Sequence, residues 1–498
     1  MGMKLHLVRA SLAQIYLSLI GILLMPVYLR YLGGEAFGLV GFSMMLQAWI
    51  QLLDLGMSPV LAREMSRFRA GYLSLDELMG KLSSLEVAMG GAGLSIALLI
   101  AMSSSTIAQH WLSVGGIGAD ELATCIALIG VSGVLSWLAG MYRSCLAGLE
   151  RQMLFNGLNV GLATLRYLGS VPLLLFISNA PVHFFAYQAG VSAFSLLIFS
   201  SAVRRCVPCK AQFGWNGSAL MSMLPMVGSM AFLSVVWVAI TQIDKLVLSG
   251  LLPLGEYGYF MLATMAASGV LILTSPLNQV VQPRLTILAE RKSEGQLINL
   301  YRLSMQVFVV AFFSLGGALA FFAEPILNLW SGRSDVAADA APILFWYALA
   351  NSVTGVLILP FMLQFAKGHL RLQVISNAVM LMLFVPALVV AAIWWGAVGS
   401  GRMQFFGNLL FFLLWVPVVH KRLLPTVSLG CMFRDAWVPG AVVTLSFFVL
   451  AKMFHDSLSG MFTVFFIGAA FMVAVVLGIA SGNLSRPFAI NLLRRAIR

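Results

Sequence analysis

The chain has 498 residues, of which 60% are hydrophobic and only 10% are charged, and its formal net charge is +12. Soluble globular domains carry about 25% charged residues, so a water-facing protein could not cover this much apolar surface, and the bilayer is the expected solvent. Five cysteines predict no disulfide framework.

Apolar runs of spanning length predict an all-α polytopic membrane protein with 14 transmembrane helices. The division between the eleventh and twelfth runs is the weakest of them. In chain order the runs cover residues 10–30, 37–57, 85–107, 122–142, 157–178, 183–203, 221–243, 257–280, 303–323, 341–363, 373–395, 402–419, 436–454 and 460–481.

The first run follows a short basic lead formed by Lys4 and Arg9. It ends in Leu29-Arg30-Tyr31, and no small-residue cleavage site follows it. This pattern predicts a retained first span rather than a removed signal peptide.

The second run ends near Asp54, in the sequence Gln51-Leu52-Leu53-Asp54-Leu55-Gly56. This carboxylate carries a coupling proton, pairs with a cation such as Arg63 or caps a helix end, and the three alternatives stay open. In the longest connection, about residues 61–84, Ser74-Leu75-Asp76-Glu77 resembles a helix start. We therefore expect a short interfacial helix there.

Arg166 lies in the middle of an apolar run. A charge in lipid costs from a few to over about ten kcal/mol, so we favour a side chain that faces the protein interior or a cavity over one that snorkels to an interface. Arg30 lies near the end of one span. Asp244 and Lys245, which are neighbours in the sequence, lie near the end of another. They either line a vestibule or anchor at the interface, and Asp244 and Lys245 are expected to form a local ion pair.

Cys206 and Cys209 form an isolated C-x-x-C, and the basic residues that flank it would oppose a metal cation. No metal site and no cofactor are predicted. The six histidines show no paired spacing, and no P-loop, G-x-S-x-G or H-E-x-x-H occurs. The sequence therefore predicts no catalytic residues, no enzyme and no ATP-driven pump.

An internal duplication is indicated by two similar hairpins. The segment Thr241–Arg284 joins two apolar runs through Pro253 and Gly255 and re-enters apolar sequence at Tyr257-Gly258. The N-terminal hairpin has the same plan, with Phe37-Gly38 at the matching place. Phe37-Gly38 aligns with Tyr257-Gly258 at an offset of 220 residues, and Arg63 aligns with Arg284 at an offset of 221. The two offsets agree to one residue, so each half of the chain is expected to begin with this hairpin.

The basic residues are distributed unequally between alternate connections. If the N-terminus is cytoplasmic, 24 of the 30 Lys and Arg fall on the cytoplasmic side, five fall on the opposite side and Arg166 lies within a span. Basic residues are retained in the cytoplasm, so this asymmetry predicts 14 spans with both termini inside.

At the hairpins the sequence resembles the Wzx-type polysaccharide-export flippases of bacteria, in the superfamily that includes multidrug exporters and lipid II flippases. Ile243-Asp244-Lys245-Leu246 with Gly255-Glu256-Tyr257-Gly258 is similar to one hairpin of that family, and Pro26-Val27-Tyr28-Leu29-Arg30 with Asp54-Leu55-Gly56 is similar to the other. The resemblance in overall plan covers the whole chain.

The resemblance implies two six-helix bundles, residues 1–215 and 216–425, around a central cavity, and two additional helices with a basic tail at 426–498. It implies alternating-access transport of an undecaprenyl-pyrophosphate-linked oligosaccharide, the repeat unit of O-antigen or another surface polysaccharide, across the bacterial cytoplasmic (inner) membrane. The resemblance further implies coupling to protons or sodium ions, contact with membrane lipids and polysaccharide polymerase partners. It implies no nucleic-acid partner. The cations carried over to the cavity are Arg9, Arg30, Arg166, Lys245 and Arg284, and the candidates for ion coupling are Asp54 and Asp244.

Three alternatives stay open. A multidrug or cation antiporter of the same superfamily would need a carboxylate-rich cavity, and the spans hold few acids. A polytopic polysaccharide polymerase or ligase would need acid and base groups on a long outer loop, and the loop at about 324–340 offers only Glu324, Arg333, Asp335 and Asp339. A non-transporting assembly partner of the cell envelope is the third.

Overall fold

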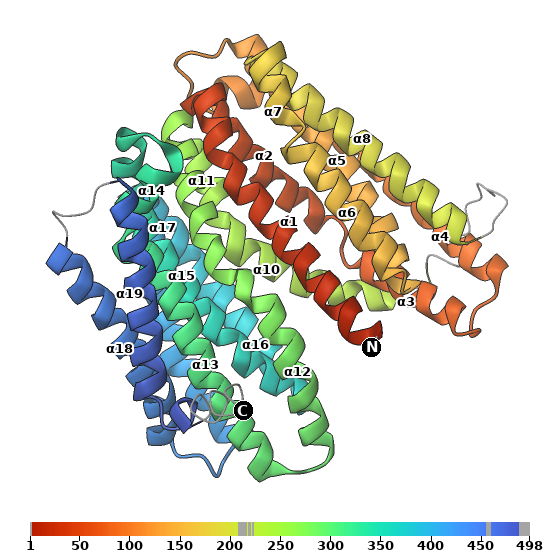
Figure 1. Cartoon of the computed structure of the whole chain (residues 1–498). Helices are drawn as coiled ribbons and strands as arrows, with labels where there is room; N and C mark the ends of the chain where they lie inside the picture. The colour runs from red at the N-terminus through yellow and green to blue at the C-terminus, as the bar shows by residue number, and fades with distance from the viewer. Residues whose placement is uncertain (1, 208–216, 218–220, 222–223, 455–459, 488–498) are drawn as a thin grey trace. The chain divides into compact units, whose positions relative to one another are not determined.

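The computed structural model describes residues 2–207, 217, 221, 224–454 and 460–487 (Figure 1). Regular structure in these residues is helical, apart from one isolated bridge between Ser113 and Pro253. The N-terminal helices are α1 (Gly2–Leu32), α2 (Gly34–Leu52), α3 (Met57–Arg69), α4 (Leu75–His110), α5 (Ala119–Gly148), α6 (Gln152–Tyr167), α7 (Ser170–Pro172), η1 (Leu173–Ile177), α8 (Pro181–Cys206) and α10 (Leu224–Leu251). The C-terminal helices are α11 (Leu254–Ser268), η2 (Gly269–Leu273), α12 (Thr274–Glu290), α13 (Glu294–Phe321), α14 (Ala323–Ser331), α15 (Ser334–Ala366), α16 (Leu370–Val379), η3 (Met380–Phe384), α17 (Val385–Leu423), α18 (Leu429–Phe454) and α19 (Gly460–Ser481).

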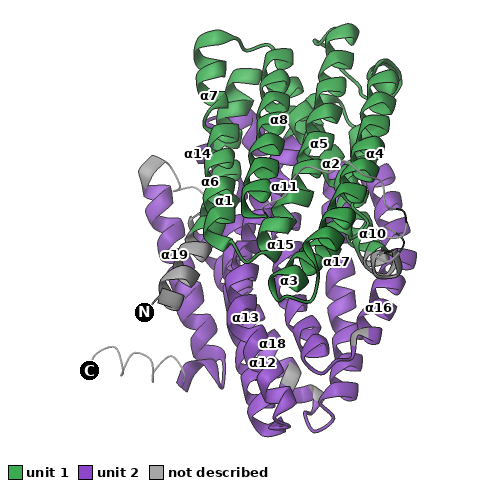
Figure 2. Cartoon of the chain, turned by 90° about the vertical axis from the view of Figure 1, so that its right-hand side faces the viewer, with its two compact units in different colours: residues 1–258 green, residues 259–498 purple. Residues whose placement is uncertain are grey.

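The chain forms two compact units, Met1–Gly258 and Tyr259–Arg498 (Figure 2). In the N-terminal unit α5 is the central helix and packs against α2, α3, α4 and α8. In the C-terminal unit α15 is the central helix and packs against α13 and α17. The expected three-part division at residues 215 and 425 stays a prediction.

Twelve helical segments are long and apolar enough to span a membrane, and the number is 13 if the bent pair α2–α3 is one span. The expected count of 14 is not confirmed. The difference arises at residues 371–423, where the eleventh and twelfth predicted runs lie in one helical segment of 53 residues. Gly396 interrupts this segment with φ 61° and ψ −149°, a conformation open to glycine because it has no Cβ.

The second predicted run is bent rather than straight. Helix α2 ends at Leu52, and α3 continues at an angle of 57° to it. Gly56 precedes α3 in the left-handed region, with φ 83°. The expected short interfacial helix at Ser74 is wrong, because Ser74 begins the long helix α4; its resemblance to a helix start is confirmed by a capping box with Glu77.

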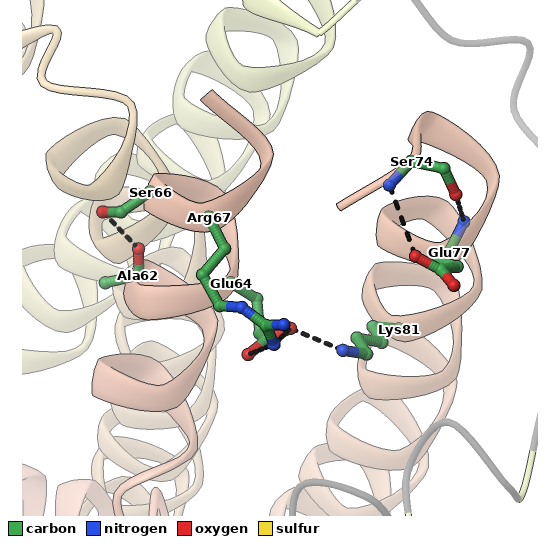
Figure 3. Close-up of polar contacts among 7 residues, drawn as sticks. All are labelled: Ala62, Glu64, Ser66, Arg67, Ser74, Glu77 and Lys81. Carbon is green, nitrogen blue, oxygen red and sulfur yellow. Dashed lines mark hydrogen bonds and ion pairs between the residues drawn. The ribbon is translucent and has the colours of Figure 1, made fainter. Parts of the chain in front are cut away.

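Polar contacts hold α3 against the start of α4 (Figure 3). Glu64 on α3 accepts hydrogen bonds from Arg67 of the same helix and from Lys81 of α4. On the other side of α3, Ser66 Oγ donates to the carbonyl of Gly148 at 2.9 Å. These contacts tie α3 both to α4 and to the end of the central helix α5.

The two similar hairpins meet at their aligned glycines. A Cβ on Gly38 would lie 2.0 Å from the carbonyl oxygen of Leu254, and a Cβ on Gly258 would lie 3.1 Å from the backbone nitrogen of Gly38. Helix backbones approach this closely only where side chains are absent. The residues that match at an offset of 220 therefore pack on each other in the N-terminal unit.

In the C-terminal unit, Gln306 of α13 holds the last two helices. Its Nε2 donates to Asp435 Oδ1 of α18 at 2.7 Å, and its Oε1 accepts from the backbone nitrogens of Leu484 and Ser485 just after α19. Arg302, one turn earlier on α13, donates to the same Asp435 carboxylate. One glutamine thus connects α13, α18 and the end of α19.

Candidate functional site

Arg166 points into the N-terminal unit. It lies in the last turn of α6, a peripheral helix with no fully buried residue. Its Nη2 donates to Ser192 Oγ of α8 at 2.8 Å and to Ser136 Oγ of α5 at 3.2 Å. The protein-facing arrangement is therefore the one present, and the guanidinium does not snorkel to the surface.

The serines around Arg166 form a buried hydroxyl cluster. Ser132 and Ser136 are one turn apart on α5, and their Oγ atoms lie 2.9 Å and 3.1 Å from Ser192 Oγ. Ser192 donates its own proton to the carbonyl of Gln188. A hydroxyl oxygen has two acceptor sites, so Ser192 can accept from Arg166 and from one of its serine neighbours.

A second arginine reaches the same cluster. Arg143 Nη2 donates to the backbone carbonyl of Ser136 at 3.0 Å, and its guanidinium lies 5.9 Å from the centre of the Phe199 ring. Arg143 was expected in a cytoplasmic connection, because its predicted span ends at residue 142. Instead α5 continues to Gly148 and keeps Arg143 inside the helix.

Two guanidinium groups therefore contact Ser136, and neither forms an ion pair with an acid among the residues that the structure describes. Each guanidinium has five N–H donors, and most of them have no hydrogen-bond acceptor in the described part of the chain. Like charges held together without a carboxylate favour an anion.

The acid bonded to Tyr142, the residue before Arg143, is engaged elsewhere. Glu86 of α4 accepts a hydrogen bond from the Tyr142 hydroxyl at 2.7 Å and lies 4.0 Å from Arg204 Nη2 of α8. Sequence reasoning missed Glu86, because it lies in the first turn of its predicted span and reads as an interfacial residue. Its charge is balanced by Arg204 rather than by Arg143.

Helix α1 fixes the position of α6. The buried Tyr28 hydroxyl lies 2.7 Å from Ser170 Oγ and donates to the carbonyl of Tyr167 at 2.8 Å. Earlier on α1, the Tyr16 hydroxyl lies 2.7 Å from Thr164 Oγ1 of α6. These contacts hold the turn that carries Arg166 against the bundle.

The predicted cavity cations Arg9 and Arg30 lie on α1, and Arg284 lies on α12. Arg30 is exposed in the last turn of α1, 6.0 Å from the centre of the Tyr31 ring. Arg284 is exposed on α12 in the C-terminal unit. Arg9 belongs to α1, and its side chain lies outside the described residues. Their assignment to substrate binding stays a prediction.

Asp244 and Lys245 form the expected local pair on α10. Lys245 Nζ lies 3.5 Å from Asp244 Oδ1, and the Lys245 backbone nitrogen donates to the same oxygen at 2.9 Å. Asp244 is 1% exposed. Its role in ion coupling stays a prediction.

Asp54 is engaged in capping. Its carboxylate accepts from the backbone nitrogen of Ser58 at 3.1 Å and from the Ser58 hydroxyl at 2.6 Å. These bonds satisfy groups in the first turn of α3, as the capping alternative requires. A coupling role for Asp54 stays a prediction as well.

In the described part of the chain, no three His, Cys, Asp or Glu side chains come together as a metal site. Cys206 of the C-x-x-C pair ends α8, and Cys209 and Lys210 lie outside the described residues, as does the basic tail beyond residue 487.

The helices and their spanning length define a polytopic membrane protein. Residues 8–289 match the family described as "Polysaccharide biosynthesis protein". This match covers more than half of the chain, and the chain belongs to that family. Sequence comparison with curated proteins gives no match.

Solved structures show the same fold. The lipid II flippase MurJ in an inward closed conformation is 14% identical, with a TM-score of 0.71 over 99% of this chain and 100% of MurJ. An inward-facing multidrug resistance MATE transporter of the MOP superfamily is 12% identical, with a TM-score of 0.66 over 84% of this chain and 100% of its own. A MOP superfamily transporter from Pyrococcus furiosus is 13% identical, with a TM-score of 0.54 over 84% and 96%.

Proposed function

We propose that the protein is a flippase that moves an undecaprenyl-pyrophosphate-linked oligosaccharide across the bacterial cytoplasmic membrane by alternating access. A diphosphate and a polar glycan cannot cross hydrocarbon unaided, whereas the lipid tail can stay in the bilayer. The family and the MurJ-like fold support the general class of lipid-linked precursor transport. The identity of the lipid-linked oligosaccharide goes beyond this general class and is part of the proposal.

The arginine pair is the observation that carries this proposal. Arg143 and Arg166 present guanidinium donors around Ser136 with no carboxylate to neutralise them in the described chain. Phosphate oxygens accept paired N–H groups of arginine with strong, charge-assisted hydrogen bonds. We assign the diphosphate to this pair, in place of the wider predicted set of Arg9, Arg30, Lys245 and Arg284.

The cation antiporter is less well supported by the same groups. A cationic drug would need a carboxylate that is not already neutralised. The buried acids of this unit are Glu64 and Asp244, and each has a lysine beside it, Lys81 and Lys245 respectively. The half-buried Glu86 lies 4.0 Å from Arg204. The polymerase or ligase alternative is less well supported, because the chain has the fold of the flippase MurJ and of a MATE transporter.

The proposal also includes the number of spans and the side of the membrane on which each terminus lies. We infer 14 spans, with residues 371–423 crossing twice and turning at Gly396. At about 1.5 Å per residue a helix of this length would measure about 80 Å, and the hydrocarbon core is about 30 Å thick. The division of Lys and Arg between alternate connections places both termini in the cytoplasm. Proton or sodium coupling through Asp54 or Asp244 and a polymerase partner remain part of the prediction.

A reconstituted transport assay tests the function. The purified protein is placed in vesicles with a fluorescent undecaprenyl-pyrophosphate oligosaccharide, and movement between leaflets is measured by chemical quenching. The variants are Arg166→Gln and Arg143→Gln, with Arg151→Gln as the control, because Arg151 is an exposed arginine at the start of α6.

Each charge-assisted bond contributes about 1.5–3 kcal/mol, so each variant of the pair should slow transport about tenfold or more. The control should transport like the unmodified protein. Transport of a cationic dye with no movement of the lipid-linked glycan would overturn the proposal in favour of the antiporter. Equal rates for all three variants would exclude the arginine pair.

A further inference from the structure

A narrow crevice of about 30 Å³ lies in the C-terminal unit, between α13, α17 and α18. Its walls are mostly apolar and aromatic. Phe412 and Leu413 line it from α17, Met305 from α13, and Phe433 and Trp437 from α18. The space is too small for a sugar ring or a drug-sized molecule, which need roughly 300 Å³ or more. Its apolar walls suit part of a single hydrocarbon chain.

The acid in the crevice wall is already paired with a cation. Asp435 is 1% exposed and accepts from Arg302 Nε at 2.5 Å, from Arg302 Nη2 at 3.3 Å and from Gln306 Nε2 at 2.7 Å. The carboxylate charge is thus neutralised. Arg302 keeps Nη1 as a donor that has no acceptor among the described residues.

His420 contributes a second donor. The Tyr301 hydroxyl is buried and lies 2.5 Å from His420 Nε2, and the ring nitrogen is the acceptor that the described residues offer it. When the hydroxyl donates to Nε2, a neutral imidazole carries its proton on Nδ1. That nitrogen is buried and has no partner in the described part of the chain. The unmet polar groups of the crevice are therefore donors.

A further cation follows the lining residues of α17 in the sequence. Leu413 and Pro417 line it at i and i+4 on α17, and Lys421 follows at i+8 on the same face, where it is exposed. No ion pair of Lys421 occurs with a described residue. The crevice thus joins an apolar slot to hydrogen-bond donors and a positive charge.

We propose that this crevice binds one acyl chain of an anionic phospholipid, whose phosphate interacts with Arg302 and Lys421. The apolar walls fit the chain, and the unmet donors fit ester and phosphate oxygens, which only accept. A zwitterionic lipid would bring a cationic group that the neutralised Asp435 does not attract. The bound lipid would fill the joint between α17 and α18. This site is independent of the proposed transport substrate.

Native mass spectrometry of the full-length protein tests the site. Dioleoyl phosphatidylglycerol and dioleoyl phosphatidylcholine, which share their acyl chains, are titrated separately. The unmodified protein should bind phosphatidylglycerol saturably and more tightly than phosphatidylcholine. Lys421→Gln should weaken phosphatidylglycerol binding about fivefold, since one basic residue contributes about 1 kcal/mol at an anionic lipid.

Two further variants separate the site from surface charge and from misfolding. Arg291→Gln removes an exposed cation after α12 and should leave binding of both lipids within about twofold. Leu413→Trp fills the slot and should weaken both lipids alike, with thermal unfolding measured on every variant to show that it folds.

Three results would overturn the proposal. Phosphatidylglycerol that binds no more tightly than phosphatidylcholine would remove the anionic selectivity. A Lys421→Gln effect no larger than that of Arg291→Gln would show surface charge alone. Unchanged binding to Leu413→Trp would show that no acyl chain enters the crevice.

Discussion

Arg143 and Arg166 reach the same serine, but only one of them stands out in the sequence. Arg166 interrupts an apolar run, and its cost in lipid makes it a candidate at once. Arg143 follows the end of a run and reads as a loop residue. Its signal is the spacing of Ser132, Ser136 and Arg143, at i, i+4 and i+11, which places all three on one face of a helix. That signal depends on knowing that α5 continues past residue 142.

At the residue scale, Ser192→Ala tests how Arg166 is held. Ser192 is fully buried and accepts from Nη2 of Arg166, so its loss leaves a guanidinium N–H without its acceptor. We expect the free energy of unfolding to fall by about 1–3 kcal/mol, measured by denaturant unfolding in detergent. Transport should slow as well, because the guanidinium is no longer held in place.

Ser200→Ala is the control for this change. Ser200 lies on the same helix α8, and its hydroxyl donates to the backbone carbonyl of Leu197 in the preceding turn. This variant should unfold within about 0.5 kcal/mol of the unmodified protein. If both variants unfold alike, Ser192 does not hold Arg166.

At the element scale, helix bends are the features that the apolar pattern does not reveal. Hydropathy reads α2 as a straight span, whereas the chain turns by 57° into α3. The turn depends on Gly56 in the left-handed region and on the hydrogen bonds between Asp54 and Ser58. A hydropathy average over a window of residues detects neither feature. The glycine contact between the two hairpins depends on packing in the same way, although the duplication pointed to those residues.

Gln306→Ala tests how α18 and α19 are attached to α13. The change removes the donor to Asp435 and the acceptor of two backbone N–H groups. Unsatisfied buried groups cost about 1–3 kcal/mol each, so the two helices should open locally at a much lower free energy. Hydrogen exchange followed by mass spectrometry should show faster exchange in residues 429–485.

A glutamine with only a local contact gives the matched control. Gln279 of α12 is exposed and donates to Ser275 Oγ one turn away. Gln279→Ala should leave exchange in residues 429–485 unchanged. Equal protection of these residues in the Gln306 variant would mean that apolar packing between α13, α18 and α19 suffices for their attachment.

At the scale of the whole molecule, the number of spans depends on residues 371–423. They form one 53-residue segment with a break at Gly396, where two spans were expected. Reporter fusions decide between these: alkaline phosphatase is active outside the membrane and green fluorescent protein inside. We expect the phosphatase to be active after Val398 and the fluorescent protein after Leu424, because each predicted span reverses the side.

A fusion after Lys367 serves as the reference for the inner side. If the fusions after Lys367 and Val398 report the same side, residues 373–395 do not cross the membrane. In that case the count of 14 spans is wrong, and the basic residues after this point fall on the other side.

The sequence by itself determined that this is an all-α membrane protein of the polysaccharide biosynthesis family, because hydropathy, span length and hairpin motifs are properties of neighbouring residues. Only the tertiary structure decided which groups meet. Arg166 and Ser192 are 26 positions apart, and Gln306 and Ser485 are 179 apart. Such contacts arise from helix packing, which directs side chains from separate helices to one point, and a one-dimensional pattern does not specify that direction.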